Sequence, residues 1–127
     1  MKDQGEPKGT LTLRTVAMPA DVNVNGDIFG GWVMSQMDIA GSIPAVEEAG
    51  GRVATISVNA MTFIRPVRVG DIFCVYTWVE RIGNTSIAIG LEAWALRRLG
   101  GQREKVTEGV FTYVAIDDDG RPRPVKG

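Results

Sequence analysis

The stretch NVNGDIFGGWVMSQMDIAG, residues 23–41, changes in character halfway along its length. Its first part is rich in Asn, Asp and Gly, which favour turns and can cap helices by accepting hydrogen bonds from free backbone N–H groups. Its second part repeats large apolar residues at intervals of three and four, the spacing of an amphipathic helix. We therefore predict a loop over residues 20–27, an N-cap at Asn25 or Asp27, and a helix over residues 28–48.

The predicted helix has an apolar face and an expected interruption. Pro44 cannot donate a hydrogen bond to the carbonyl of Ala40, so we expect it to kink the helix or to end it early. Gly50 and Gly51 follow the apolar pattern, at the position where glycine commonly closes a helix. The residues expected on the apolar face are Phe29, Trp32, Val33, Met37, Ala40 and Ile43.

On either side of this helix the apolar residues alternate instead, which indicates strands. We expect strands over residues 10–18, 53–64, 72–82, 85–97 and 105–116. In the second of these, one face should consist of Ala54, Ile56, Val58, Ala60 and Ile64. Because the later strands are joined by short connections, they should pair as antiparallel neighbours. A single helix must then cover one face of this sheet, so the sequence predicts a two-layer α+β domain.

The length and charge of the chain bound its class. A chain of 127 residues suits one domain with one core, and we assign residues 1–9 to a flexible tail and residues 10–127 to that domain. The 14 Lys and Arg nearly balance the 15 Asp and Glu, so no net field favours nucleic acid or a membrane surface as a partner. No apolar leader and no long apolar run is present, so we expect a cytoplasmic protein.

The sequence contains no His and a single cysteine, Cys74. The absence of His excludes His-dependent catalytic triads, His proton transfer and His-ligated metal sites. We accordingly expect no metal centre and no cofactor. Cys74 lies in an apolar strand without a basic neighbour in the sequence, so we interpret it as a structural thiol. Any chemistry must then use carboxylates, hydroxyls, Arg, Lys or backbone amides.

Asp38 is the unusual residue of the predicted helix. Asp has a poor propensity for the middle of a helix, and no Lys or Arg stands three or four positions away to pair with it. It shares a stripe with Ser35 and Ser42, whose hydroxyls we expect to face water. Asp38 is therefore either hydrated or used in chemistry.

The start of the helix suggests a second functional element. Unpaired N–H groups at a helix N-terminus bind anions or a developing oxyanion, and Gly30 and Gly31 would let a carbonyl or phosphate approach them closely. A plain loop and cap would show the same residues. Basic side chains, which either bind phosphate or are simply solvated, gather in two places, at Arg65 and Arg68 and at Arg121 and Arg123.

Four segments together resemble the hotdog-fold acyl-CoA thioesterases of the bacterial YciA type: LRTVAMPADVNVNGDIFGGWVMSQMDIAG, GRVATISVNAMTFIRPVRVGDIFCVY, GNTSIAIGLEAW and VTEGVFTYVAIDDDGRPRPV. The resemblance covers residues 10–125, and its most specific block is NGDIFGGW followed by QMD. It implies a hotdog fold, in which an antiparallel sheet of about five strands wraps one long central helix. It also implies acyl-CoA as substrate, coenzyme A bound at subunit interfaces, and a homohexamer assembled from dimers.

The resemblance also implies roles for individual residues. Asp38, in the QMD block, would be the catalytic carboxylate. The NGD turn would approach the site across a dimer interface, which gives Asp27 a supporting role and Asn25 a place in substrate binding. Gly30 and Gly31 would lie at the substrate carbonyl. The residues similar to coenzyme A contacts of the family are Arg65, Arg68, Thr85, Ser86, Arg121 and Arg123.

The expected activity is hydrolysis of an acyl-CoA thioester by one of two routes. Asp38 would either activate water as a general base or attack the thioester carbon to form a transient anhydride. The alternative is a non-catalytic acyl-CoA-binding sensor or subunit on the same fold, which would not need Asp38. A dehydratase of the same fold would need a His that this chain lacks, and a purely structural oligomer would explain neither Asp38 nor the glycine-rich helix start.

Overall fold

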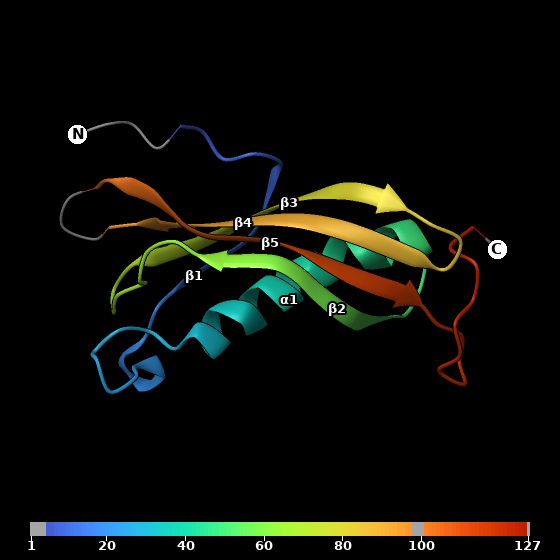
Figure 1. Cartoon of the computed structure of the whole chain (residues 1–127), viewed down its shortest axis with the longest axis horizontal. Helices are drawn as coiled ribbons and strands as arrows, with labels where there is room; N and C mark the ends of the chain where they lie inside the picture. The colour runs from blue at the N-terminus through green and yellow to red at the C-terminus, as the bar shows by residue number, and fades with distance from the viewer. Residues whose placement is uncertain (1–4, 98–100, 127) are drawn as a thin grey trace.

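The computed structural model describes residues 5–97 and 101–126, which form one long helix laid along a five-stranded antiparallel sheet (Figure 1). The helix α1 spans Gly30–Ala49, after a short 3-10 helix at Pro19–Asp21. The strands are β1 (Thr10–Val16), β2 (Val53–Phe63), β3 (Ile72–Ile82), β4 (Ser86–Leu96) and β5 (Arg103–Ala115). The predicted α+β class, the single long helix and the strands are confirmed, with small differences at their ends.

The strand order is β1-β3-β4-β5-β2, so β1 and β2 form the edges of the sheet. All adjacent pairs are antiparallel, as predicted. The expectation that β2 and β3 would be neighbours is wrong, because residues 64–71 carry the chain from the β2 edge across to β3 on the other side of the sheet. In this crossing loop the carbonyl of Val67 accepts the N–H of Ile28 at 2.9 Å, which ties the loop to the start of α1.

A buried ion pair holds the crossing loop in place. Asp71 is only 4% exposed and pairs with the guanidinium of Arg97, which also contacts Glu104 at 2.9 Å. The carboxylate of Asp71 accepts the backbone N–H of Arg68 at 2.8 Å as well. A carboxylate this deeply buried needs both a charged partner and hydrogen bonds. The cluster therefore fixes the loop that carries Arg65 and Arg68.

The start of α1 differs from the prediction. Phe29 occupies the N-cap position, and no side chain caps the helix. The predicted cap at Asn25 or Asp27 is therefore wrong. The turn that contains these residues closes on itself instead, through hydrogen bonds to Asn23.

The middle and end of α1 show how the helix tolerates its proline. It continues through Pro44 to Ala49, so the early end expected at Pro44 does not occur. Only one intrahelical hydrogen bond is lost there, and the turns on either side pack into the core. Gly50, at φ 67°, closes the helix by donating its N–H to the carbonyl of Val46 at 2.8 Å, as predicted. Within the described residues, no helix is long and apolar enough to cross a membrane.

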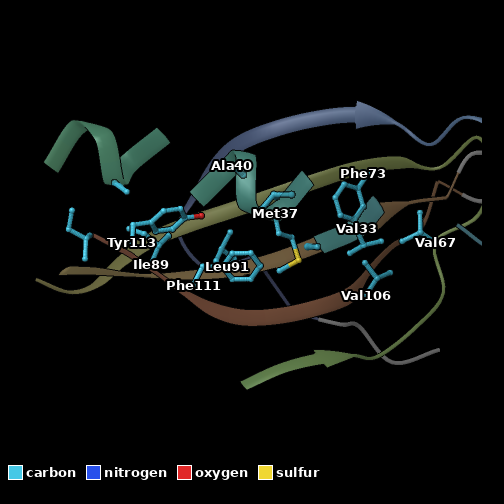
Figure 2. Close-up of a cluster of buried hydrophobic side chains, with 14 of the residues drawn as sticks. Val33, Met37, Ala40, Val67, Phe73, Ile89, Leu91, Val106, Phe111 and Tyr113 are labelled. Carbon is cyan, nitrogen blue, oxygen red and sulfur yellow. The ribbon is translucent and has the colours of Figure 1, made fainter. Parts of the chain in front are cut away.

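The core lies between α1 and the inner face of the sheet, as Figure 2 shows. The helix contributes its buried stripe of Val33, Met37, Ala40, Gly41, Ala45 and Ala49. In the strands that face it, alternate side chains point inwards, as the geometry of a strand requires. The largest of these inward side chains are Tyr113, Phe73, Phe111, Ile87, Ile89 and Leu91.

Many apolar side chains of α1 and of the edge strand β2 remain exposed. Of the predicted helix face, Val33, Met37 and Ala40 are buried, whereas Phe29 and Ile43 are 50% and 43% exposed. The single face predicted for β2 is wrong, because its register with β5 shifts after Thr55 and again after Asn59. We call the following residues the exposed apolar set: Phe29, Met34, Ile39, Ile43, Val46, Ile56, Val58, Phe63 and Ile64. Exposed apolar surface on this scale favours a partner.

Residues 5–9 precede β1 and contact the sheet. Glu6 pairs with Arg103 at 2.9 Å. The backbone N–H of Lys8 donates to Glu92 at 3.1 Å, and its ammonium lies 4.4 Å from the ring centroid of Trp78. Residues 1–4 of the tail predicted from the sequence lie outside the described residues.

Candidate active site

The carboxylate of Asp38 lies near the middle of α1 and faces two hydroxyl groups from the sheet. The Oγ1 of Thr55, in β2, donates to its Oδ1 at 2.7 Å. The hydroxyl of Tyr113, in β5, lies 3.0 Å from the same Oδ1 and 2.9 Å from the backbone carbonyl of Asp38. Asp38 is partly exposed. Its carboxylate is therefore held in place and still open to solvent.

The phenol of Tyr113 is a permanent donor in this arrangement. Its side chain is fully buried, at 0% exposure. Burial, the negative charge of Asp38 and the hydrogen bond to that carboxylate all raise the pKa of Tyr113 above its usual value of 10.0. Sequence analysis missed both hydroxyls, because Thr55 and Tyr113 stand 17 and 75 positions from Asp38 and no local pattern connects them.

Gly41 makes the approach of Tyr113 possible. A Cβ at this position would overlap the hydroxyl oxygen of Tyr113 and would stand 3.1 Å from the ring carbon that bears it. Glycine in the interior of a helix costs about 1 kcal/mol relative to alanine. The close passage of the phenol past the helix explains why glycine is needed here.

The two serines of the Asp38 stripe take no part in this cluster. Ser35 donates to the carbonyl of Trp32 at 2.9 Å, and Ser42 donates to that of Ile39 at 2.7 Å. Both hydroxyls thus bond back to their own helix, a common arrangement for Ser within helices.

The turn before α1 is organised by Asn23, which sequence analysis did not single out. Its Oδ1 accepts the backbone N–H of Asn25 at 2.8 Å and that of Asp27 at 3.2 Å. Its own N–H donates to the carbonyl of Asp27 at 2.7 Å. The signal in the sequence was the run of Asn and Gly itself, since Asn side chains bond the backbone two residues on. Asn25 is exposed and Asp27 is partly buried.

A cavity of about 340 Å³ lies beside the start of α1. Its lining includes three predicted site residues, Asp27, Gly30 and Arg65, together with Phe63 and Thr107. Thr107 is 1% exposed, and its Oγ1 has no hydrogen-bond partner among the described residues. Because no side chain caps α1, the N–H groups of its first turn are available to an acceptor at this end.

Asp38 and the helix start lie too far apart to act together within one chain. Gly30 and Asp38 are separated by eight residues of helix, which is about 12 Å at ~1.5 Å per residue. A thioester carbonyl is much shorter than this distance. The sequence therefore identified two elements, the carboxylate and the glycine-rich helix start, that a single copy of the fold does not bring together.

The predicted binding residues near the start of α1 are Arg65 and Arg68. Arg65 is partly buried and donates to the backbone carbonyl of Lys105 at 2.8 Å. Arg68 is exposed, while its backbone N–H bonds to Asp71. Arg68 thus has the more accessible guanidinium of the two.

The remaining predicted binding residues lie at the opposite end of α1. Arg123 donates to the carbonyl of Ala49 at 2.8 Å and so completes the C-terminus of the helix. Arg121 is exposed, 4.0 Å from Asp119. Thr85 and Ser86 lie where β4 begins, and the carbonyl of Thr85 accepts the N–H of Ala115 at 2.9 Å. Contact of these four residues with a substrate stays a prediction.

Cys74 shows no sign of activation. Burial raises the pKa of its thiol, and the nearby guanidinium groups of Arg14 and Arg103 offset this effect only in part. A thiol that resists ionisation is a poor nucleophile. This agrees with its interpretation as a structural residue.

Comparison with known proteins places this geometry in a family. A family model described as "Thioesterase superfamily" matches residues 25–100. The acyl-CoA thioester hydrolase YciA of Salmonella typhimurium is 57% identical over 122 residues, which cover 94% of this chain and 92% of that protein. YciA of Escherichia coli K12 is 56% identical over 120 residues, which cover 92% and 91% of the two chains.

Solved structures agree with these matches. The hexameric thioesterase y2039 from Yersinia pestis has a TM-score of 0.90 at 57% identity, over 94% of this chain and 97% of that one. An aspartate-to-alanine mutant of HI0827, a hexameric broad-specificity acyl-coenzyme A thioesterase, has a TM-score of 0.90 at 50% identity, over 93% and 87%. The helix laid along a five-stranded antiparallel sheet is thus the hotdog fold. The chain belongs to the thioesterase superfamily and, within it, to the family of the YciA acyl-CoA thioester hydrolases.

Proposed function

We propose that this protein hydrolyses acyl-CoA thioesters to a free acid and coenzyme A, with the carboxylate of Asp38 as the reacting group. The observation that carries the proposal is a carboxylate held by Thr55 and Tyr113 yet partly exposed. Such a group suits a general base or a nucleophile. The substrate class is supported by relatives that are named acyl-CoA thioester hydrolases and are 56% and 57% identical to this chain.

Two routes lead from this carboxylate to the same products. In the first, Asp38 takes a proton from water as the water oxygen bonds to the thioester carbon, and the C–S bond then breaks with its electron pair on sulfur. In the second, an oxygen of Asp38 bonds to the thioester carbon, the same C–S bond breaks, and water hydrolyses the resulting anhydride. In both, the leaving thiolate belongs to a thiol of pKa about 8.5, so departure needs no acid such as His.

We further propose that the complete site forms between copies of this chain. Because Gly30 and Asp38 lie about 12 Å apart along α1, the carbonyl attacked by Asp38 of one copy would be polarised by the helix start of another. The exposed apolar set lies on α1 and β2 and at two residues that flank them, Phe29 and Ile64, and so on the same two elements as Asp38 and Thr55. Association through it would bury apolar surface next to the site. The relatives y2039 and HI0827 are hexameric, which supports a hexamer for this chain. Assembly of that hexamer from dimers stays a prediction.

Coenzyme A would be bound by the basic and hydroxyl residues at the ends of the helix. Its phosphates would pair with guanidinium groups, and the exposed Arg68 and Arg121 are the most accessible of these. The turn with Asn25 and Asp27 would support the substrate near the helix start. The cytoplasmic location expected from the sequence stays a prediction.

The experiment that tests this function is free-thiol release from a series of acyl-CoA thioesters of increasing chain length. Wild type is compared with Asp38→Ala and with Glu48→Ala, which removes an exposed carboxylate from the same helix. We expect Asp38→Ala to lose at least about 100-fold in kcat while keeping its fold and its affinity for coenzyme A. Glu48→Ala should behave as wild type.

Each other outcome has a definite meaning. Full turnover by Asp38→Ala would move the chemistry to another residue, with Asp27 as the next candidate. Absence of turnover in wild type with binding of coenzyme A intact would favour the non-catalytic acyl-CoA-binding protein.

A further inference from the structure

The carboxylate of Asp38 is held through one of its two oxygens. Both hydroxyl donors, from Thr55 and Tyr113, point at Oδ1. Among the described residues, no group donates a hydrogen bond to Oδ2. We propose that Tyr113 is a positioning residue, which together with Thr55 fixes Oδ1 so that Oδ2 is the oxygen that meets the substrate or the attacking water. This inference rests on the proposed function, because it takes Asp38 as the reacting group.

The contact between Tyr113 and the carboxylate exceeds what burial of a phenol requires. A buried Tyr must satisfy its hydroxyl, and the backbone carbonyl of Asp38, 2.9 Å away, would do so alone. The hydroxyl nevertheless also lies 3.0 Å from Oδ1. Since it carries a single proton, it shares that proton between the backbone and the side chain of the same residue. The orientation of the carboxylate is thereby tied to the backbone of its own helical turn.

The two hydroxyls that restrain the carboxylate come from directly paired residues of neighbouring strands, since Thr55 and Tyr113 lie opposite each other in the β2–β5 pairing. Thr55 belongs to the edge strand β2 and is exposed, whereas Tyr113 belongs to β5 and is buried. Figure 2 shows the ring of Tyr113 within the core beneath the helix. A rigid donor from the core therefore sets the position, and a surface donor closes the arrangement. Rotation of the carboxylate about its bond to Cβ would break both hydrogen bonds at once.

Gly41 provides an independent sign that the position of the phenol matters. The helix carries glycine at a point where any side chain would overlap the Tyr113 hydroxyl. An alanine would favour the helix by about 1 kcal/mol. Glycine at this position therefore lowers the stability of the helix at the turn next to Asp38, but it leaves room for the hydroxyl of Tyr113 to reach the helix.

The test is the Tyr113→Phe substitution, which removes only the hydroxyl. Tyr76→Phe is the matched control, because Tyr76 is the only other tyrosine of the sequence and lies in β3 opposite Glu92, outside the site. For both variants and for Asp38→Ala we would measure kcat and KM by thiol release, the cooperativity of thermal unfolding, and the oligomeric state. A loose carboxylate is misplaced in the reaction but is not needed to bind coenzyme A. We therefore expect Tyr113→Phe to lower kcat by roughly 10- to 100-fold, with KM within about twofold and Tyr76→Phe unchanged.

The outcomes separate this inference from the proposed function. An inactive Asp38→Ala with a fully active, folded Tyr113→Phe would overturn the positioning role and leave the thioesterase intact. A raised KM with an unchanged kcat in Tyr113→Phe would also overturn the positioning role. A fully active Asp38→Ala would instead overturn the proposed function. If Tyr113→Phe does not unfold cooperatively, Thr55→Val tests the other donor at an exposed position, and an unchanged kcat in that variant overturns the arrangement around Oδ1.

Discussion

Replacing Gly41 with alanine tests the packing around Asp38 directly. The added methyl group favours the helix by about 1 kcal/mol. Against this, the methyl overlaps the hydroxyl oxygen of Tyr113 and stands 3.1 and 3.2 Å from two of its ring carbons. Tyr113 is fully buried, so its ring can move away only by displacing the side chains packed around it. Overpacking of a core costs roughly 1–3 kcal/mol, and loss of the hydrogen bond to a charged group costs about 1.5–3 kcal/mol more.

The sum predicts that Gly41→Ala is destabilised by roughly 1.5–5 kcal/mol and that its kcat falls together with its stability. Denaturant unfolding and thiol-release kinetics would measure the two effects. Gly90→Ala is the matched control, since a Cβ there overlaps the indole of Trp78. That ring is only partly buried, and neither Gly90 nor Trp78 contacts Asp38 through a hydrogen bond, so this variant should keep its kcat. Equal stability and equal kcat in Gly41→Ala and wild type would refute the reasoning.

Two further predictions concern buried hydroxyls. Because the folded state raises the pKa of Tyr113 above 10.0, the stability that comes from the protonated phenol is complete below about pH 10 and is lost as the pH rises towards the folded pKa, by up to about 1.4 kcal/mol per pH unit. The stability difference between wild type and Tyr113→Phe should therefore shrink above that pH in denaturant titrations, and a difference that is constant with pH would contradict the raised pKa. Thr107→Val should stabilise the protein by about 1 kcal/mol, since it removes a buried hydroxyl without a partner among the described residues. A destabilised Thr107→Val variant would show that this hydroxyl has a partner in the assembled protein.

Sequence patterns located the elements well and their faces less well. The helix and strands could be predicted because their apolar periods are local properties of the chain. The buried face of β2 could not, because the register shifts after Thr55 and Asn59 arise from pairing with a distant strand. The helix face was predicted only in part for a related reason. Large side chains such as Phe29 and Ile43 suggested a core face. In the structure the sheet packs against a stripe that includes small residues such as Gly41 and Ala45, which lets the helix approach the sheet closely.

The candidate site divides in the same way. Asp38 and the glycine-rich helix start could be found from the sequence alone, because an unpaired acid within a helix and a glycine pair at the start of a helix are both visible in a short window. The donors Thr55 and Tyr113 could not be found, since their positions relative to Asp38 depend on how β2 and β5 fold across α1.

The sequence by itself determined the fold class, the reacting carboxylate proposed here and, through resemblance, the family. Only the tertiary structure decided how that carboxylate is held, by the hydroxyls of Thr55 and Tyr113. The physical reason is that the interactions behind these features act over different separations along the chain. Propensity, periodicity and charge pairing act between residues a few positions apart, whereas strand order, register and the meeting of a helix with two distant strands depend on packing of the whole chain.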